Sequence, residues 1–173
     1  MKIGVLLLAP FFLLRFGLLS LVNREAVGRA AYFAPMLERE KATYWIYQVS
    51  NLLLLLCVLF SKVQAVPPLL YGGAALYAAG LLLLAASVVA FAHPAEDGFS
   101  RTGVYRLSRN PMYVAYFLYF LGCSMLARSW MSAVVTLIFQ VSAHWIIRAE
   151  ERWCVQQYGD AYKQYMQKVR RYI

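Results

Sequence analysis

Five long apolar runs alternate with polar segments along the chain, and they predict its main elements. The runs cover residues 3–22, 43–60, 69–92, 111–127 and 130–147. Because a helix needs about 20 mostly apolar residues to cross the hydrocarbon core of a bilayer, each run predicts a membrane-spanning helix. The first run follows a lysine, as in a signal peptide, but no small-residue cleavage site comes after it, so we expect it to be retained.

The segment after residue 147 is charged and amphipathic. Its aromatic and apolar side chains recur at steps of three and four residues, at Tyr158, Tyr162, Tyr165, Val169 and Tyr172. This spacing predicts a helix over about 160–172 at the membrane surface, with its aromatic face among the lipid headgroups. Gly159 and Asp160 predict a break between the fifth span and this helix. We therefore expect one all-α domain over residues 1–173, with five transmembrane helices and a C-terminal amphipathic interfacial helix.

Two local features predict how the spans pack together. The third run holds many small residues between Gly72 and Gly80, which favours close contact with other helices over contact with lipid. The fourth and fifth runs are joined only by Arg128 and Ser129, so they predict a tight antiparallel hairpin. The start of the fourth span and the end of the fifth are therefore expected to lie side by side.

Composition supports an integral membrane protein. Hydrophobic residues make up 62% of the chain and charged residues 14%, whereas soluble domains average about 45–50% and about 25%. The three cysteines lack the number and spacing of a disulfide framework or a zinc site, so we expect no metal. The net charge of +9 is explained by the sorting of charge across a bilayer, so we expect no nucleic acid partner.

The distribution of basic residues predicts the orientation. With five spans, three lysines and arginines fall on the side of the N-terminus and thirteen on the other side, while Arg15 lies within the first run. Since cytoplasmic loops carry the excess of lysine and arginine, we expect the N-terminus outside and the C-terminus in the cytoplasm. For Arg15 two interpretations stand: a charge inside a span indicates function, and a position near the cytoplasmic end allows its side chain to reach the interface.

The polar segment before the fourth span carries the first candidate site. Asn110 and Pro111 open that span, and we interpret them as the N-cap and first residue of a helix, because proline suits the first helical position and asparagine is a good cap. The positive end of the helix dipole would then face a loop that carries Arg106 and Arg109. Such an arrangement is typical of a site for an anionic group.

The end of the fifth span carries the second candidate site, at Glu150 and Glu151 beside Arg148. Adjacent helical residues point about 100° apart, so one carboxylate is expected to face a ligand and the other to pair with an arginine. The hairpin brings this site next to the first, and a zwitterionic ligand would bridge the two. His144, one to two turns earlier in the span, is the candidate base.

The combined pattern resembles the membrane methyltransferases typified by isoprenylcysteine carboxyl methyltransferase and phosphatidylethanolamine N-methyltransferase. The resemblance covers roughly residues 85–173. Its residues are Gly103, Tyr105, Arg109, Asn110, Pro111 and Tyr113, then Arg148, Glu150 and Glu151, then Tyr158, Gly159, Tyr162, Tyr165, Val169 and Arg171. Asn110 stands where many isoprenylcysteine enzymes have histidine, so no role that needs an imidazole is expected there.

The resemblance implies an S-adenosylmethionine-dependent methyltransferase with a cytoplasmic pocket and a lipid or prenylated acceptor that enters from the bilayer. The residues expected to bind the cofactor are Tyr105, Asn110, Pro111, Met112, Tyr113, Glu150 and Glu151. The residues expected to serve catalysis are Arg109, Arg148 and His144. The arginines favour a carboxylate acceptor, which needs no base. The alternatives are N-methylation of a phospholipid amine and, in another class, a small transporter or lipid-binding scaffold. A transporter is expected to show paired repeats and ionisable groups at mid-membrane.

The charge count generates a first test. Reporter domains fused to each end of the chain should give an external signal from the N-terminal fusion and a cytoplasmic signal from the C-terminal one, because the cytoplasmic side carries the excess of basic residues. The reverse pair of signals would contradict this orientation.

Overall fold

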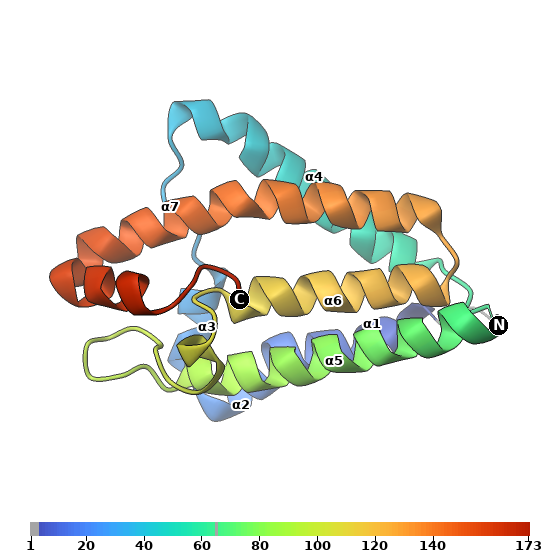
Figure 1. The fold of residues 1–173 in the computed structure, drawn as a ribbon, viewed down its shortest axis with the longest axis horizontal. Coiled ribbons are helices and arrows are strands. Elements are labelled where there is room, and N and C mark those ends of the chain that lie inside the picture. The colour runs from blue at the N-terminus through green and yellow to red at the C-terminus, as the bar shows by residue number, and fades with distance from the viewer. Residues whose placement is uncertain (1–3, 65) are drawn as a thin grey trace.

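The computed structural model describes residues 4–64 and 66–173, and within these ranges the secondary structure consists of helices joined by loops, with no strand (Figure 1). The elements are α1 (Gly4–Phe12), η1 (Leu13–Leu18), α2 (Leu19–Val22), α3 (Arg24–Ala31), η2 (Glu38–Glu40), α4 (Lys41–Leu59), α5 (Pro67–Ala92), η3 (Gly103–Arg106), α6 (Pro111–Leu126) and α7 (Trp130–Lys168). Lys2, which the charge count includes, lies outside the described residues.

Four helices are long and apolar enough to cross a bilayer. They cover Gly4–Val22, Glu38–Leu59, Pro67–Ala92 and Trp130–Lys168. The fourth predicted span forms α6, whose 16 residues extend about 24 Å, less than the hydrocarbon core of about 30 Å. The all-α prediction is confirmed for the described residues, and the structure supports four of the five expected spans by length.

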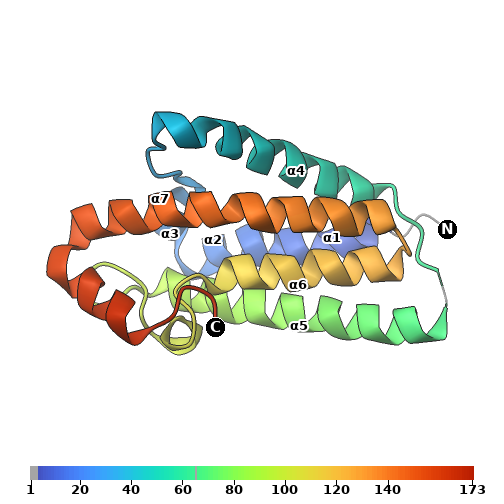
Figure 2. The ribbon, with the colours of Figure 1, turned by 45° about the horizontal axis from the view of Figure 1, so that its top comes forward.

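The long helices lie roughly along one direction, with α6 between α5 and α7 in both ribbon views (Figures 1 and 2). The helix α4 packs on α7, and α1 packs on α4. The N-terminal span is irregular: α1 contains Pro10, and η1 is a turn of π-helix. The carbonyl of Leu7 accepts hydrogen bonds from the hydroxyls of Tyr77 and Tyr119 at 2.9 and 3.1 Å, which fastens α1 to α5 and α6.

The polar segment 23–42, between the first two apolar runs, is partly helical. Residues Arg24–Ala31 form α3, and η2 follows before α4 begins. Asn23 starts α3 because its side-chain oxygen accepts hydrogen bonds from the backbone N–H groups of Glu25 and Ala26. The same side chain donates to the carbonyl of Ala92 at 2.9 Å, so this short helix is also anchored to the end of α5.

The C-terminal helix differs from the prediction in its end and in what its aromatic face contacts. Gly159 has φ 56° and ψ −131°, so the predicted break is present. The helix ends at Lys168, however, and the residues after it fold back toward α6 (Figure 1). Tyr162 and Tyr165, which we expected among lipid headgroups, are buried against Phe99 of the loop after α5. That loop covers the aromatic face and removes it from the surface.

The centre of the bundle is aromatic. Phe11 of α1 stacks on Tyr119 of α6 with ring centres 4.8 Å apart, and Tyr47 of α4 stacks on Phe139 of α7 at 5.0 Å. Phe120 lies between these pairs and contacts both Phe11 and Phe139. These rings join the four helices α1, α4, α6 and α7.

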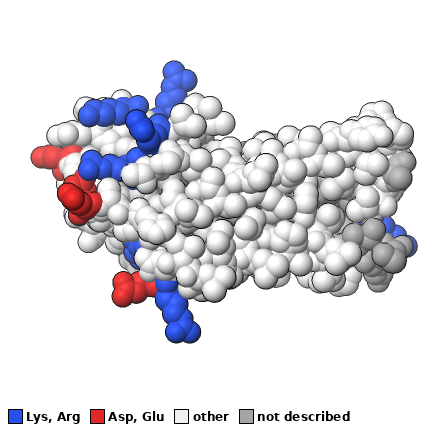
Figure 3. All heavy atoms as spheres, turned by 90° about the horizontal axis from the view of Figure 1, so that it is seen from below, with Lys and Arg blue, Asp and Glu red and all other residues white. Residues whose placement is uncertain are grey.

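Charged side chains gather at one end of the molecule on the face shown in Figure 3. This is the end at which α7 turns back and at which α3 lies (Figure 1). The remainder of that face is almost free of charge, as expected for a surface in contact with lipid. The polar end is therefore where a site for charged ligands has its residues.

The close contact of α5 and α6 generates a second test. A Cβ atom added at Gly122 would lie 2.5 Å from the backbone nitrogen of Tyr77, so Gly122→Ala should force the helices apart and cost about 1–3 kcal/mol. The measurement is the melting temperature in detergent. Gly28→Ala is the control, because nothing lies within 4 Å of its added Cβ. Equal melting temperatures for the two variants would contradict the close packing.

Candidate functional site

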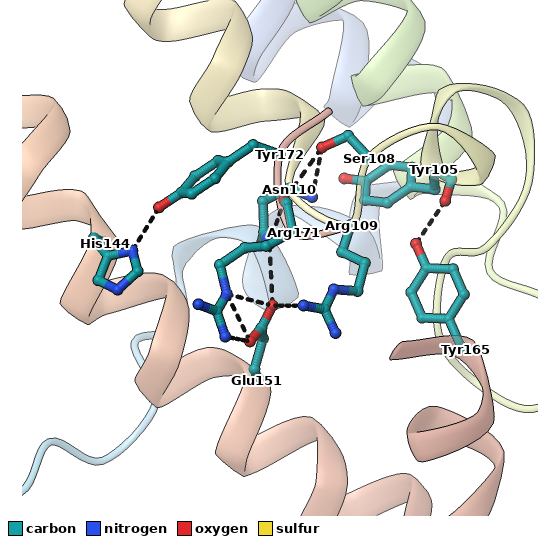
Figure 4. Close-up of polar contacts among 9 residues, drawn as sticks. All are labelled: Tyr105, Ser108, Arg109, Asn110, His144, Glu151, Tyr165, Arg171 and Tyr172. Atoms are coloured by element: carbon teal, nitrogen blue, oxygen red, sulfur yellow. Dashed lines mark hydrogen bonds and ion pairs between the residues drawn. The ribbon is translucent and has the colours of Figure 1, made fainter. Parts of the chain in front are cut away.

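The candidate site lies where the start of α6, the middle of α7 and the C-terminal tail (residues 169–173) meet (Figure 4). Its centre is the carboxylate of Glu151, which is 4% exposed. Two segments send polar groups to this carboxylate, which α7 itself carries. They are the segment before α6 and the tail.

Glu151 accepts from two arginines and an amide. The Arg109 guanidinium lies 3.2 Å from Oε1, and the Arg171 guanidinium lies 2.7 Å from Oε2 with a second nitrogen at 3.0 Å. The side-chain amide of Asn110 donates to Oε1 at 3.4 Å. The hydrogen bonds to Glu151 raise the pKa of Arg171 above its ordinary value, so this arginine stays charged. We call Glu151, Arg109, Asn110 and Arg171 the carboxylate cluster.

The tail is held by its backbone as well as by Arg171. The backbone N–H of Arg109 donates to the carbonyl of Arg170 at 3.0 Å, and the amide of Asn110 donates to the carbonyl of Arg171 at 3.1 Å. Tyr172 hydrogen-bonds through its hydroxyl to Nδ1 of His144 at 2.9 Å. The tail therefore spans the gap between the start of α6 and the face of α7 (Figure 4).

The structure corrects the role expected for Asn110. Pro111 does open α6, but the side chain of Asn110 makes no capping hydrogen bond. Its amide is directed instead to Glu151 and to the carbonyl of Arg171. A cap would use the side-chain oxygen as an acceptor, whereas here the NH2 group orients the side chain by donating to a charged carboxylate, and hydrogen bonds to charged groups contribute about twice as much as neutral ones.

Glu150 takes different partners from Glu151, as the 100° spacing predicts. Its Oε1 accepts a hydrogen bond from the hydroxyl of Tyr113 at 2.8 Å. No ion pair to Glu150 occurs among residues 4–64 and 66–173. Glu150 thus presents a carboxylate that a hydroxyl orients and no arginine neutralises, whereas Glu151 is fully occupied by protein groups.

The other predicted residues are distributed between the interior and the surface. Tyr105 is buried, and its carbonyl accepts a hydrogen bond from Tyr165 at 2.6 Å. Pro111 and Met112 are buried at the start of α6. Arg148 is exposed on α7, so the structure does not bring it into the carboxylate cluster.

Three residues at this end were not among the predicted site residues. Arg171 belongs to the tail, and only its place in the resemblance pointed to it. Glu40 of η2 is 4% exposed and accepts hydrogen bonds from both terminal nitrogens of Arg152, one of them at 3.0 Å, which ties the start of α4 to α7. Arg15 donates to the carbonyl of Ala30 at 2.8 Å. No local pattern links Glu40 to a partner 112 residues away.

The carboxylate cluster generates a third test. Glu151→Gln should lower the melting temperature markedly, because removing one partner of a buried ion pair costs about 3–5 kcal/mol. It should also release the tail, so trypsin should cut at Arg170 and Arg171 faster than in the wild type. Asp160→Asn is the matched control, since it removes an exposed ion pair with Lys163 that contributes little. Identical melting and proteolysis in the two variants would contradict the tail-anchoring role of Glu151.

Comparisons with known proteins agree with the resemblance drawn from the motifs. The family described as phospholipid methyltransferase matches residues 71–161, more than half of the chain. A stretch of 68 residues is 35% identical to protein-S-isoprenylcysteine O-methyltransferase from Schizosaccharomyces pombe, which covers 39% of this chain and 29% of that protein. The chain therefore spans less than a third of this relative's length. No solved structure matches the chain. The matched segment includes α6, most of α7 and both glutamates of the site, and the chain belongs to the phospholipid methyltransferase family.

Proposed function

We propose that the chain transfers a methyl group from S-adenosylmethionine to a lipid or prenylated acceptor embedded in the membrane. The observation that carries this proposal is the pairing of Glu150 with Tyr113 beside the carboxylate cluster, at the joint of α6 and α7. This joint lies within the segment that matches the family. The name of the relative from Schizosaccharomyces pombe supports a prenylated acceptor, and the description of the family supports a phospholipid.

The polar groups at this joint fit such a cofactor by their chemistry. The Nε of Arg109 is a buried donor with no hydrogen-bond acceptor in the described part of the chain, and it suits an anionic group such as a carboxylate. The carboxylate of Glu150 suits an ammonium or the hydroxyls of a ribose. The residues proposed to hold the cofactor are Tyr105, Asn110, Pro111, Met112, Tyr113 and Glu150. When bound, S-adenosylmethionine supplies an electrophilic methyl group on a sulfonium.

The residues of the chain would act mainly by positioning. Methyl transfer needs the lone pair of the acceptor in line with the methyl group and water kept away. Correct placement of two reactants contributes up to about 7–11 kcal/mol to lowering a barrier. The ion pairs of Glu151 hold the loop before α6 against α7, so they fix the position of Tyr113 relative to Glu150. Glu151 is therefore proposed to support the site rather than to contact the cofactor.

The arginines at this end favour a carboxylate acceptor. A carboxylate is already nucleophilic, whereas an ammonium must first lose a proton to a base. His144 is the candidate base, but its Nδ1 is engaged by Tyr172. O-methylation of a prenylated carboxylate is the primary proposal. N-methylation of a phospholipid amine is the second candidate, because the matching family is described as phospholipid methyltransferase.

The proposed topology places this site in the cytoplasm. In it, α6 is the fourth of five spans, and the charged end of the bundle faces the cytoplasm. A 16-residue helix is accommodated where its polar start lies in the headgroup region, because a short span is compensated by local thinning of the bilayer. The acceptor would then reach the site from the cytoplasmic leaflet.

The test of the proposed function is incubation of the purified protein with methyl-labelled S-adenosylmethionine and a total membrane lipid extract. The expected product is a labelled lipid-soluble species. Alkaline hydrolysis should release the label as methanol if the product is a methyl ester and should leave it in place if the product is a methylated amine. Absence of any labelled product, together with no binding of S-adenosylhomocysteine, would contradict the proposal.

Glu150 generates a fourth test. Glu150→Gln should weaken the binding of S-adenosylhomocysteine by about tenfold or more, since a hydrogen bond to a charged group contributes about 1.5–3 kcal/mol. The melting temperature should change little, because Glu150 has no ion pair to lose among the described residues. Calorimetry measures the affinity, and Glu96→Gln, an exposed loop variant, is the control. Unchanged affinity in Glu150→Gln would remove this residue from the cofactor site.

A further inference from the structure

Arg15 is a charged residue at an unusual place in the N-terminal span. It lies in η1, a turn of π-helix between α1 and α2. Such turns are rare and are frequently found at functional sites. Seven residues separate Arg15 from Val22 at the end of the span, which corresponds to about 10 Å of helix. A charge at that depth is costly unless it has a partner or a function.

The guanidinium of Arg15 is only partly satisfied by the protein. One terminal nitrogen donates to the carbonyl of Ala30 at 2.8 Å, whereas the other is buried and has no acceptor in the described part of the chain. Arg15 is absent from the ion pairs of that part. A side chain that simply reached the interface would expose its charged end to water or headgroups. Because this nitrogen is buried, that interpretation does not hold. The charge of Arg15 has no anionic partner among the described residues, so a bound anion would supply one.

The surroundings of Arg15 place it at the proposed active site. Its charge acts on Tyr116 of α6, Tyr105 of η3 and Glu150 of α7. Glu150 lies beyond ion-pairing distance and is hydrogen-bonded to Tyr113. Arg15 and Glu150 therefore belong to the same region of the interior. An anionic group there would be attracted by Arg15 and repelled by Glu150.

The position of Arg15 in the chain indicates which reactant it serves. The segment that matches the family is 71–161, and it contains Glu150, Tyr113 and Arg109. Arg15 lies outside this segment, on the helix that meets the bilayer. Groups shared by a family suit the common cofactor, whereas a group outside the shared segment suits the acceptor that distinguishes one member from another.

We propose that Arg15 binds an anionic group of the methyl acceptor, namely the carboxylate of a prenylated amino acid or the phosphate of a phospholipid. This inference rests on the proposed function for the identity of the reaction. The anion supplies the acceptor that the free guanidinium nitrogen lacks, and it fixes the depth at which the acceptor stops along α1. Arg15 is thus a residue that determines acceptor specificity.

The test compares pairs of ligands with and without the anionic group, with no cofactor present. The first pair is N-acetyl-S-farnesylcysteine and its methyl ester, and the second is phosphatidylethanolamine and diacylglycerol, which lacks the phosphate headgroup. In one pair, the member that carries the anionic group should raise the melting temperature of the wild type more than the member that lacks it. Arg15→Gln should abolish this difference. The pair that responds identifies the source of the anion.

Kinetics give a second readout. With saturating S-adenosylmethionine, Arg15→Gln should raise the KM for the acidic acceptor about tenfold or more and leave the affinity for S-adenosylhomocysteine within about twofold. Arg15→Lys should recover part of the loss, because lysine keeps the charge but lacks the planar fork. Arg29→Gln is the control, since Arg29 also donates to a helix carbonyl, that of Phe91, but is exposed.

Three results would overturn the inference. One is equal binding of the ligands with and without the anionic group by the wild type in both pairs, which is independent of any methyl transfer. Another is a loss of S-adenosylhomocysteine affinity in Arg15→Gln, which would assign Arg15 to the cofactor. If Arg15→Gln does not fold, Arg15→Met decides, because it keeps an unbranched side chain without the charge, and a folded methionine variant with the wild-type KM would show that the charge of Arg15 is not needed for the acceptor. Failure of the proposed function would appear separately, as a wild type that neither binds S-adenosylhomocysteine nor forms a methylated product.

Discussion

The ion pairs of Glu151 are the interaction on which the candidate site depends. They join α7, the segment before α6 and the tail at one buried carboxylate. A buried carboxylate is expensive to desolvate, and it is tolerated here because two arginines and an amide surround it. These ion pairs add to the backbone contacts of the tail, and they fix the distance between the loop before α6 and α7. The orientation of Tyr113 and Glu150 follows from this arrangement.

The two adjacent glutamates have different roles although they lie on the same helix turn. Glu151 is saturated by protein donors and holds segments together. Glu150, turned about 100° away, has a tyrosine hydroxyl as its partner and has no ion pair among the described residues. Arg109 and Arg15 differ in another way, because Arg109 pairs with Glu151 whereas Arg15 has no ion pair in the described part of the chain, and each guanidinium has one buried nitrogen without an acceptor there. Candidate ligand-binding residues are therefore recognised by hydrogen-bonding or charged groups that lack a protein partner, and not by charge alone.

Features that depend on neighbours in sequence were predictable. Pro111 at a helix start and Gly159 at a helix break follow from backbone restrictions, and the apolar runs mark the long helices. Features that depend on distant residues were not. Asn110 is a residue type that often caps helices, but its side-chain NH2 group donates instead to a carboxylate 41 residues away. The aromatic stripe of the last helix predicts a lipid-facing surface, since nothing near it in sequence indicates that Phe99 covers it.

The break at Gly159 imposes a constraint on chain length. Its backbone angles belong to a region that only glycine adopts readily, and they turn the last helix back so that Arg171 reaches Glu151. Inserting or deleting one helical residue between Gly159 and Arg171 would rotate the residues that follow by about 100° and shift them by about 1.5 Å. The arginine would then point away from the carboxylate. The number of helical residues between Gly159 and Arg171 is therefore fixed by the ion pair that this segment has to reach.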